Sequence, residues 1–374
     1  MLRMISIPLI SAIEILTLTL PAFCGEDTPG SKPSFSGVIW ATYWHAISGS
    51  PTNVGNGTAN SFDIKRVWLS ASGMLDEFWS WKIIFESSGT PPLTAFAKAA
   101  YINWAPKGSL KHDITFGLQP TLFFATTDQF WGYRIIAITA RELLGSTVVS
   151  NFMGMGTGAI ADFGVKYSIR PHETFSVSVM MSNGAGHRAI ESNMHKKLGF
   201  TVGVIPIPDS IIEFYLEDER GYIQVDQAGK TERKSHKGLG LLTGYRTERF
   251  VLGVDYFQKT FPDKSIFDPD GTMHDADSEV ISLFGSIKVK EKFRLLGRFD
   301  YYVPITDEEL IWDNFGKSGE SLLLFGADCS YRPPNANFIL TYQLKSFDAK
   351  YYNGNSWVVR NPYGLIALDV AIKY

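Results

Sequence analysis

Apolar and polar residues alternate with a period of two along most of the chain, as the carboxyl-terminal stretch Gly364–Tyr374 illustrates. Ile366 and Leu368 fall on one face of this stretch, whereas Asp369 and Lys373 fall on the other. Successive side chains of a β-strand point to opposite sides, so this alternation predicts a strand with one apolar and one polar face. About ten residues is also the length that a tilted strand needs to cross a bilayer.

The same pattern recurs often enough to predict sixteen strands. Short connectors such as Arg246–Arg249 and Lys290–Lys292 alternate with long ones such as Asp218–His236 and Phe257–Ser278. An even strand number, with tight turns on one side and long loops on the other, is typical of a transmembrane barrel. Such a barrel must close, because lipid offers no hydrogen-bond partners to the backbone N–H and C=O groups of an open sheet edge. The predicted fold is an all-β transmembrane antiparallel barrel of about sixteen strands: Ser34–Ile47, Arg66–Gly73, Trp81–Glu86, Lys98–Trp104, His112–Leu118, Phe163–Ile169, Phe175–Ser182, Leu198–Val204, Ile211–Glu217, Gly238–Tyr245, Phe250–Tyr256, Ile281–Val289, Phe293–Tyr302, Leu322–Tyr331, Phe338–Leu344 and Tyr363–Tyr374.

Lys166 indicates which face of the wall meets lipid. It alternates with Val165 and Tyr167, and a lysine facing the middle of the bilayer would cost roughly 2–4 kcal/mol. Lys166 should therefore face a wet interior, and sixteen strands enclose an aqueous channel rather than a packed core. In the first strand, we expect Trp40, Tyr43 and Trp44 to form part of an interfacial aromatic girdle.

The segment from Gln119 to about Ile160 interrupts the alternation. It is about forty residues long, falls in the third long loop and contains a stretch, Thr139–Leu144, that could be helical. Loops of this length within a compact domain usually carry function.

Composition supports a single exported domain. The 374 residues are 45% hydrophobic with a formal net charge of −3, which gives no electrostatic footprint for nucleic acid. Residues 1–24 have the pattern of a secretory signal, with Arg3 before an apolar run and Cys24 before a cut at Gly25. No linker divides residues 25–374, and Cys329 is the only cysteine among them, so no internal disulfide is expected.

Arginines provide the best candidate site. Arg134 and Arg141 lie in the long third loop, and planar guanidinium groups bind anions through paired hydrogen bonds. The alternative is that they fix the loop to carboxylates of the barrel wall. Arg294 and Arg298 share one face of a strand near Asp300, where the alternative is an ion-pair network that braces the wall.

The remaining inward positions carry both signs of charge. A ring of one sign is what makes a pore selective, and the sequence predicts a mixed lining instead. The basic members are Arg66, Lys82, Lys166, Arg294 and Arg298, and the acidic members are Glu86, Glu213, Glu217, Asp255, Asp300, Asp328 and Asp369.

Other motifs carry less information. Asp268–Thr272 has the oxygen-rich character of a calcium loop but lacks its full spacing, and Lys230–Lys237 is a basic run that could meet lipopolysaccharide or solute. Gly154–Gly158 lacks the strand, helix and lysine of a nucleotide site. The histidines show no zinc spacing, and no Gly-x-Ser-x-Gly elbow occurs. We therefore expect no cofactor, no metal and no enzymatic activity.

Four short motifs spread along the chain resemble the phosphate-selective porin O and P family of bacterial outer membranes. They are Phe62–Gly73, Ile114–Pro120, Ser182–Gly186 and Arg294–Tyr302. The first resembles an early basic strand ending in Ser-Gly, and the second a Gly-Gln-x-x-x-Pro segment with compressed spacing. The third matches an Asn-Gly strand end, and the fourth an Arg-Tyr-Asp strand.

The resemblance implies a sixteen-stranded, usually trimeric porin in the outer membrane, whose third loop folds into the lumen. Such a protein lets small hydrophilic solutes or anions, such as phosphate, diffuse through a water-filled pore, with lipid and lipopolysaccharide around it. Two alternatives stay open: a non-conducting barrel that acts as a receptor or adhesin, and an outer-membrane barrel enzyme.

Overall fold

The structure is a computed structural model in which the whole chain is present. It describes residues 32–48, 60–88, 94–108, 110–137, 139–141, 160–184, 186, 196–225, 231–261, 276–306, 320–331, 336–347, 350–352, 357–359 and 362–373. The predicted signal, the Asp268–Thr272 loop and the Gly154–Gly158 stretch all lie outside these residues.

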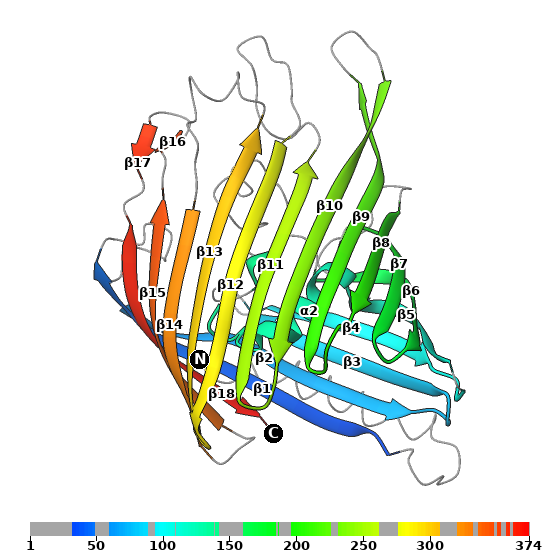
Figure 1. Cartoon of the computed structure of the whole chain (residues 1–374), viewed down its shortest axis with the longest axis horizontal. Helices are drawn as coiled ribbons and strands as arrows, with labels where there is room; N and C mark the ends of the chain where they lie inside the picture. The colour runs from blue at the N-terminus through cyan, green and yellow to red at the C-terminus, as the bar shows by residue number, and fades with distance from the viewer. Residues whose placement is uncertain are drawn as a thin grey trace.

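Sixteen long strands, one short hairpin and one helix make up the regular structure of the described residues (Figure 1). The elements are β1 (Ser34–Ser48), β2 (Asn60–Met74), β3 (Trp79–Ser88), β4 (Thr94–Trp104), β5 (Lys111–Pro120), α2 (Leu122–Trp131), β6 (Ala161–His172), β7 (Phe175–Ser182), β8 (Lys197–Val204), β9 (Ser210–Val225), β10 (Thr231–Arg246), β11 (Phe250–Phe261), β12 (Ala276–Lys290), β13 (Phe293–Thr306), β14 (Glu320–Tyr331), β15 (Ala336–Phe347), β16 (Lys350–Tyr352), β17 (Trp357–Val359) and β18 (Tyr363–Lys373).

The sixteen long strands form a closed antiparallel barrel in which each strand pairs with its neighbours in sequence. The first and last strands, β1 and β18, close the wall, with Val38 opposite Lys373 and Trp44 opposite Ala367. Closure leaves no edge strand in the barrel, which is the condition for a sheet to sit in lipid. The predicted fold class and strand number are therefore confirmed. No helix in the described part of the chain is long and apolar enough to cross a membrane.

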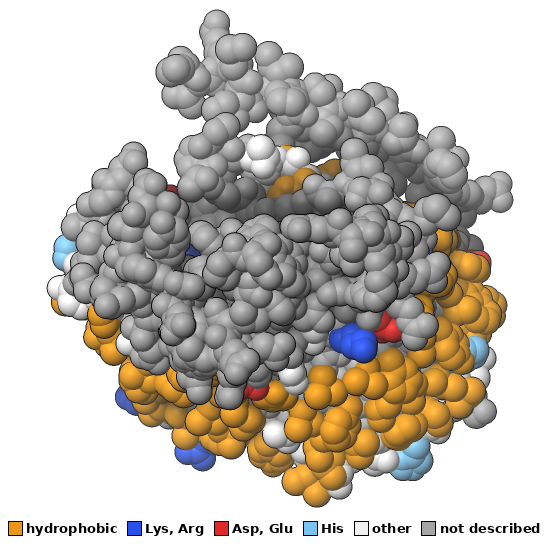
Figure 2. Space-filling model, turned by 90° about the horizontal axis from the view of Figure 1, so that it is seen from above, with side chains coloured by type: hydrophobic (Ala, Val, Ile, Leu, Met, Phe, Trp, Pro, Cys, Tyr) orange, Lys and Arg blue, Asp and Glu red, His pale blue; other side chains and the backbone are white. Residues whose placement is uncertain are grey.

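The two faces of the wall have opposite character. On β18, Ile366 and Leu368 point outward with 43% and 39% of their surface exposed, whereas Asp369 points inward and is fully buried. Figure 2 shows many outward apolar side chains, in orange, along the part of the described wall that is visible in this view. This distribution is what a barrel in lipid requires, and it confirms the predicted alternation on the last strand.

An aromatic row crosses four strands at their short-turn ends. The Trp79 ring is tilted against that of Trp104, His112 lies edge-on to Trp104, and Tyr167 lies edge-on to His112. Rings of this kind are typical of the membrane–water interface.

The predicted place of two tryptophans on β1 is wrong. Trp40 and Trp44 are 8% and 7% exposed and share the inward face with Thr42, whereas Tyr43 points outward against Phe62. Alternation allows only one of these two sets to face lipid.

Several strands run further than predicted at their long-loop ends. β9 reaches Val225 and β10 begins at Thr231, so much of the expected Asp218–His236 loop is a strand pair. The hairpin of β16 and β17 was also not predicted.

Candidate functional site

The first half of the third long loop forms a compact unit, residues 121–141, which we call the loop segment. β5 ends at Pro120, and α2 follows directly, with Thr121 as its N-cap. The helix ends at Gly132, whose left-handed backbone (φ 71°) lets its N–H donate to the Asp128 carbonyl at 2.9 Å. Glycine is the usual residue at this position because it has no Cβ to clash. Of the predicted Thr139–Leu144 helix, the residues beyond Arg141 lie outside the described part.

Arg141 fixes the far end of the loop segment to the wall. Its Nε donates to Asp255 at 3.0 Å and its Nη2 at 2.6 Å, while Nη1 donates to the Phe123 carbonyl at 2.7 Å. Both charged side chains are 0% exposed. The guanidinium also lies over the rings of Tyr215 and Phe257. Arg141 therefore does what the alternative interpretation described, which is to hold the loop against a wall carboxylate.

Further contacts hold the loop segment to inward residues of other strands. Lys65 of β2 reaches the Ile135 carbonyl at 2.9 Å and Asp369 of β18 at 2.6 Å. Burial and the nearby Asp328 carboxylate raise the pKa of Tyr133, so its phenol stays protonated. Three more contacts join the loop and the wall: Thr126 donates to Glu213 at 2.6 Å, Tyr133 donates to Asp328 at 3.2 Å, and Arg246 of β10 donates to the Gln129 carbonyl.

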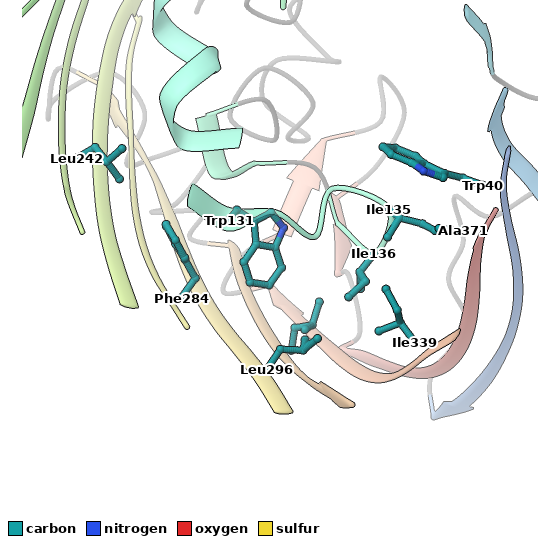
Figure 3. Close-up of a cluster of buried hydrophobic side chains, with 10 residues drawn as sticks. Trp40, Trp131, Ile135, Ile136, Leu242, Phe284, Leu296, Ile339 and Ala371 are labelled. Carbon is teal, nitrogen blue, oxygen red and sulfur yellow. The ribbon is translucent and has the colours of Figure 1, made fainter. Parts of the chain in front are cut away.

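An apolar cluster lies between the loop segment and the inward wall (Figure 3). Its loop members are Trp131, Ile135 and Ile136, which pack against wall residues from seven strands. The wall members are Trp40, Leu242, Phe284, Leu296, Leu324, Ile339 and Ala371. Burial of this apolar surface stabilises the docked segment, which explains why Trp40 faces inward rather than toward lipid.

A cluster of three cations lies where the loop segment meets β2, β3 and β4. Lys98 and Arg66 approach Glu86 at 2.7 Å and 3.4 Å, and the Trp68 indole donates to the same carboxylate at 2.6 Å. Arg134 lies 6.0 Å from the centre of the Trp68 ring. We call Arg66, Lys98 and Arg134 the cation cluster.

The other predicted site residues are spread over the wall. Arg298 pairs with Asp300 at 2.7 Å and is 3% exposed beneath the Trp131 ring, so it braces the wall. Arg294 donates to Ser286 and to the Glu248 carbonyl near a short turn. Lys82 and Lys166 lie on the inward faces of β3 and β6, as their register with Ser72 and Thr115 shows.

Sequence reasoning missed two cations, Lys98 and Lys65, for one shared reason. Each is an extra residue in its strand, without a partner position on the neighbouring strand. Ala97 and Ala99 of β4 pair with consecutive residues of β3, so Lys98 lies between them. Ile64 and Arg66 of β2 pair with consecutive residues of β1, so Lys65 lies between them. Such β-bulges turn a side chain that strict alternation would send to lipid. A lysine among the apolar residues of β4 was the available signal.

In the part of the chain that the structure describes, no group of three or more His, Cys, Asp or Glu side chains is arranged to hold a metal ion. Cys329 is exposed on the outward face, as predicted.

Searches by sequence and by structure give different results. No known family profile matches the chain, and no curated protein sequence matches it. Solved structures do match. DcaP, an outer-membrane channel of Acinetobacter baumannii, aligns with a TM-score of 0.66 at 12% identity, over 94% of this chain and 99% of DcaP. The fold is that of the outer-membrane porins.

Two further porin-fold neighbours support this assignment. An anion-selective porin from Comamonas acidovorans aligns with a TM-score of 0.61 at 10% identity, over 92% of this chain and all of that one (100%). OmpT, an outer-membrane protein of Vibrio cholerae, aligns with a TM-score of 0.60 at 12% identity, over 93% of this chain and 99% of OmpT. Identities this low show the fold alone, so the resemblance to the phosphate-selective family stays a prediction. The porin-like barrel and its apolar outer face are consistent with a bacterial outer membrane.

Proposed function

We propose that the chain is a general diffusion porin of the outer membrane, with a mild preference for anions set by the cation cluster. The observation that carries the proposal is the position of this cluster, with charges from both the wall and the loop segment beside one carboxylate. Selectivity in such a pore comes from lining charges and from loop constriction, without covalent chemistry.

The balance of charges favours the cation cluster over the rest of the inward wall. In the described part of the chain, Arg66, Lys98 and Arg134 neighbour two carboxylates, Glu86 and Asp128, so three basic side chains lie beside two acidic ones. Arg141 with Asp255 and Arg298 with Asp300 form matched pairs, whereas Lys197 and Lys259 share Glu217 on the wall. A solute passing the matched pairs meets little net field, and we assign the discrimination to the cation cluster because it joins the wall to the loop segment.

The test is the zero-current potential of the refolded protein in a planar bilayer under a potassium chloride gradient. Wild type should give a potential on the anion side, and Arg66→Gln with Arg134→Gln should shift it toward zero. A unit charge about 4 Å from the ion path contributes about 1 kcal/mol in water, or roughly five-fold in relative permeability. We therefore expect each substitution to lower the anion-to-cation ratio by up to about five-fold.

Lys107→Gln is the matched control, because Lys107 pairs with Glu77 at an exposed turn and its side chain is 72% exposed. This variant should leave the potential unchanged. A cation-side potential in wild type, or equal potentials in all variants, would contradict the anion preference while leaving the porin role intact.

One observation favours a second function. The loop segment packs against inward residues of seven strands, and a barrel whose lumen is filled could act as a receptor or adhesin. A folded, heat-modifiable barrel that shows no channel openings would support that function or the enzyme alternative over a porin.

The assembly is part of the proposal. We expect export with residues 1–24 as signal, insertion among lipid and lipopolysaccharide, and a homotrimer. In support, one structural neighbour, OmpT of Vibrio cholerae, has been solved in a trimer form. Crosslinking in native membranes should give a trimer ladder.

A further inference from the structure

Each member of the cation cluster lies on an aromatic ring. The contacts, from cation to ring centre, are Arg66 to Trp40 at 5.7 Å, Lys98 to Trp68 at 3.8 Å, and Arg134 to Phe124 at 4.9 Å. The Trp40 and Trp68 rings are themselves 4.6 Å apart. The positive charges therefore lie against aromatic rings, unlike pore-lining cations that are surrounded mainly by water.

Arg66 and Trp68 are the members of this surface that a solute can reach. The Arg66 side chain is 19% exposed and Trp68 is half-buried, whereas the Lys98 and Arg134 side chains are 11% and 4% exposed. A bound solute would touch the Arg66 guanidinium and the Trp68 indole, while the two buried cations add their field.

The charge of the cluster limits the charge of the solute that it favours. Among the described residues, the cluster lies beside the carboxylates of Glu86 and Asp128. A second negative charge on a bound solute would add repulsion from these two carboxylates. A doubly charged oxyanion would also have to give up water beside indole rings that offer it few hydrogen bonds.

We propose that the cation cluster and its rings form a binding site for singly charged organic carboxylates that carry a ring, in preference to phosphate. The inference rests on the proposed porin function and names the solute class of that same site. The carboxylate accepts hydrogen bonds from the Arg66 guanidinium, and the ring of the solute packs against the exposed part of Trp68.

Relative permeabilities of acetate, benzoate and phosphate test this site. They come from zero-current potentials with potassium chloride on one side of the bilayer and the test salt on the other, at mildly alkaline pH. Acetate against benzoate isolates the ring, and phosphate adds the second charge. The ratio of benzoate to acetate permeability should exceed the ratio of their mobilities in free water. Phosphate should have the lowest permeability of the three.

Trp68→Leu should lower the benzoate-to-acetate ratio about three-fold, the size of one ring–ring contact, and Trp68→Phe should keep it. Heat modifiability on gels confirms that each variant is folded. Trp79→Leu, which removes a ring from the outward aromatic row, should change nothing.

The proposal is overturned if Trp68→Leu and wild type give the same ratio, or if phosphate permeates as readily as benzoate. A wild type without anion preference in chloride alone would instead contradict the proposed anion preference, and a folded barrel without channel openings would overturn the porin proposal on which the site rests.

Discussion

Arg134 and Arg141 lie in the same loop segment, but they have different surroundings. The three hydrogen-bonding nitrogens of Arg141 are taken up by Asp255 and by the Phe123 carbonyl, with both charges fully buried. Arg134 instead lies over the rings of Phe124 and Trp68 beside other cations. A buried, fully bonded guanidinium positions the loop, whereas a guanidinium that lies beside Arg66 and Lys98 adds to the positive field of that cluster.

Arg141→Met should destabilise the barrel by about 3–5 kcal/mol, because it leaves the Asp255 carboxylate buried without its partner. The measurement is the urea midpoint of the refolded protein, followed by tryptophan fluorescence. The double variant Arg141→Met with Asp255→Leu should regain most of the loss, since it removes both charges. An unchanged midpoint in the single variant would show that the pair does not hold the loop segment.

The residue scale also shows how far alternation can predict a site. It assigned Arg66, Lys82 and Lys166 to the inward face correctly, because these residues follow the regular period. It could not assign Lys65 and Lys98, because each lies at a bulge where the period breaks. The alternation pattern could not predict the roles of the loop arginines either, because Arg141 and its partner Asp255 are far apart in the sequence.

Strand β10 is shaped to receive the loop segment. Its inward positions include Gly240 and Gly244, where a side chain would collide with the loop. A Cβ on Gly240 would lie 3.1 Å from the Arg141 guanidinium, and one on Gly244 would lie 2.5 Å from the Phe130 ring. Glycine ordinarily weakens a strand. At these two positions it lowers the local stability of β10 but allows the loop segment to approach the wall closely.

Gly244→Ala should therefore cost about 1–3 kcal/mol, the usual range for overpacking. Gly297→Ala is the matched control, because its Cβ would face outward with its nearest neighbour at an ordinary 3.6 Å. Urea midpoints of the two variants provide the comparison. Equal midpoints would mean that the loop segment can move away from β10 at little cost.

Strand ends were predicted less well than strand centres, for a physical reason. The centre of β9, from Ile211 to Glu217, alternates because one side faces lipid and the other the interior. Its extension toward Val225 begins with Asp218, Glu219 and Arg220, so three charged residues follow one another and the apolar positions of the alternation are lost. The period-two pattern of apolar and polar residues is therefore absent from this extension, although its pairing with β10 continues to Val225.

At the scale of the whole molecule, the inward wall has two unlike halves. Strands β9 to β18 supply most of the partners of the loop segment, whereas β6 to β8 carry small inward residues such as Gly164, Ser178 and Thr201. These short side chains reach less far into the lumen than the loop segment does on the opposite half. Solutes should therefore pass on the side of β2 to β8, which includes the strands of the cation cluster.

Neighbouring positions on β7 test the two faces of the wall. Val179→Arg would place a charge on the lipid side, at a cost of about 2–4 kcal/mol near the bilayer midplane, and should reduce the yield of heat-modifiable barrel in vesicles. Ser178→Arg places the same side chain inward, so it should fold normally and increase the anion preference. Equal yields from the two variants would contradict the assignment of the faces.

The ammonium group of Lys65 joins three distant parts of the chain: an early strand, the loop segment and Asp369 of the last strand. The contact with Asp369 cannot form until the two ends of the polypeptide have met, so the complete set of contacts around Lys65 is tied to the final step of assembly. Contacts so far apart in sequence form slowly. During refolding, burial of Trp131 and acquisition of heat resistance should follow one time course, and Lys65→Met should separate them.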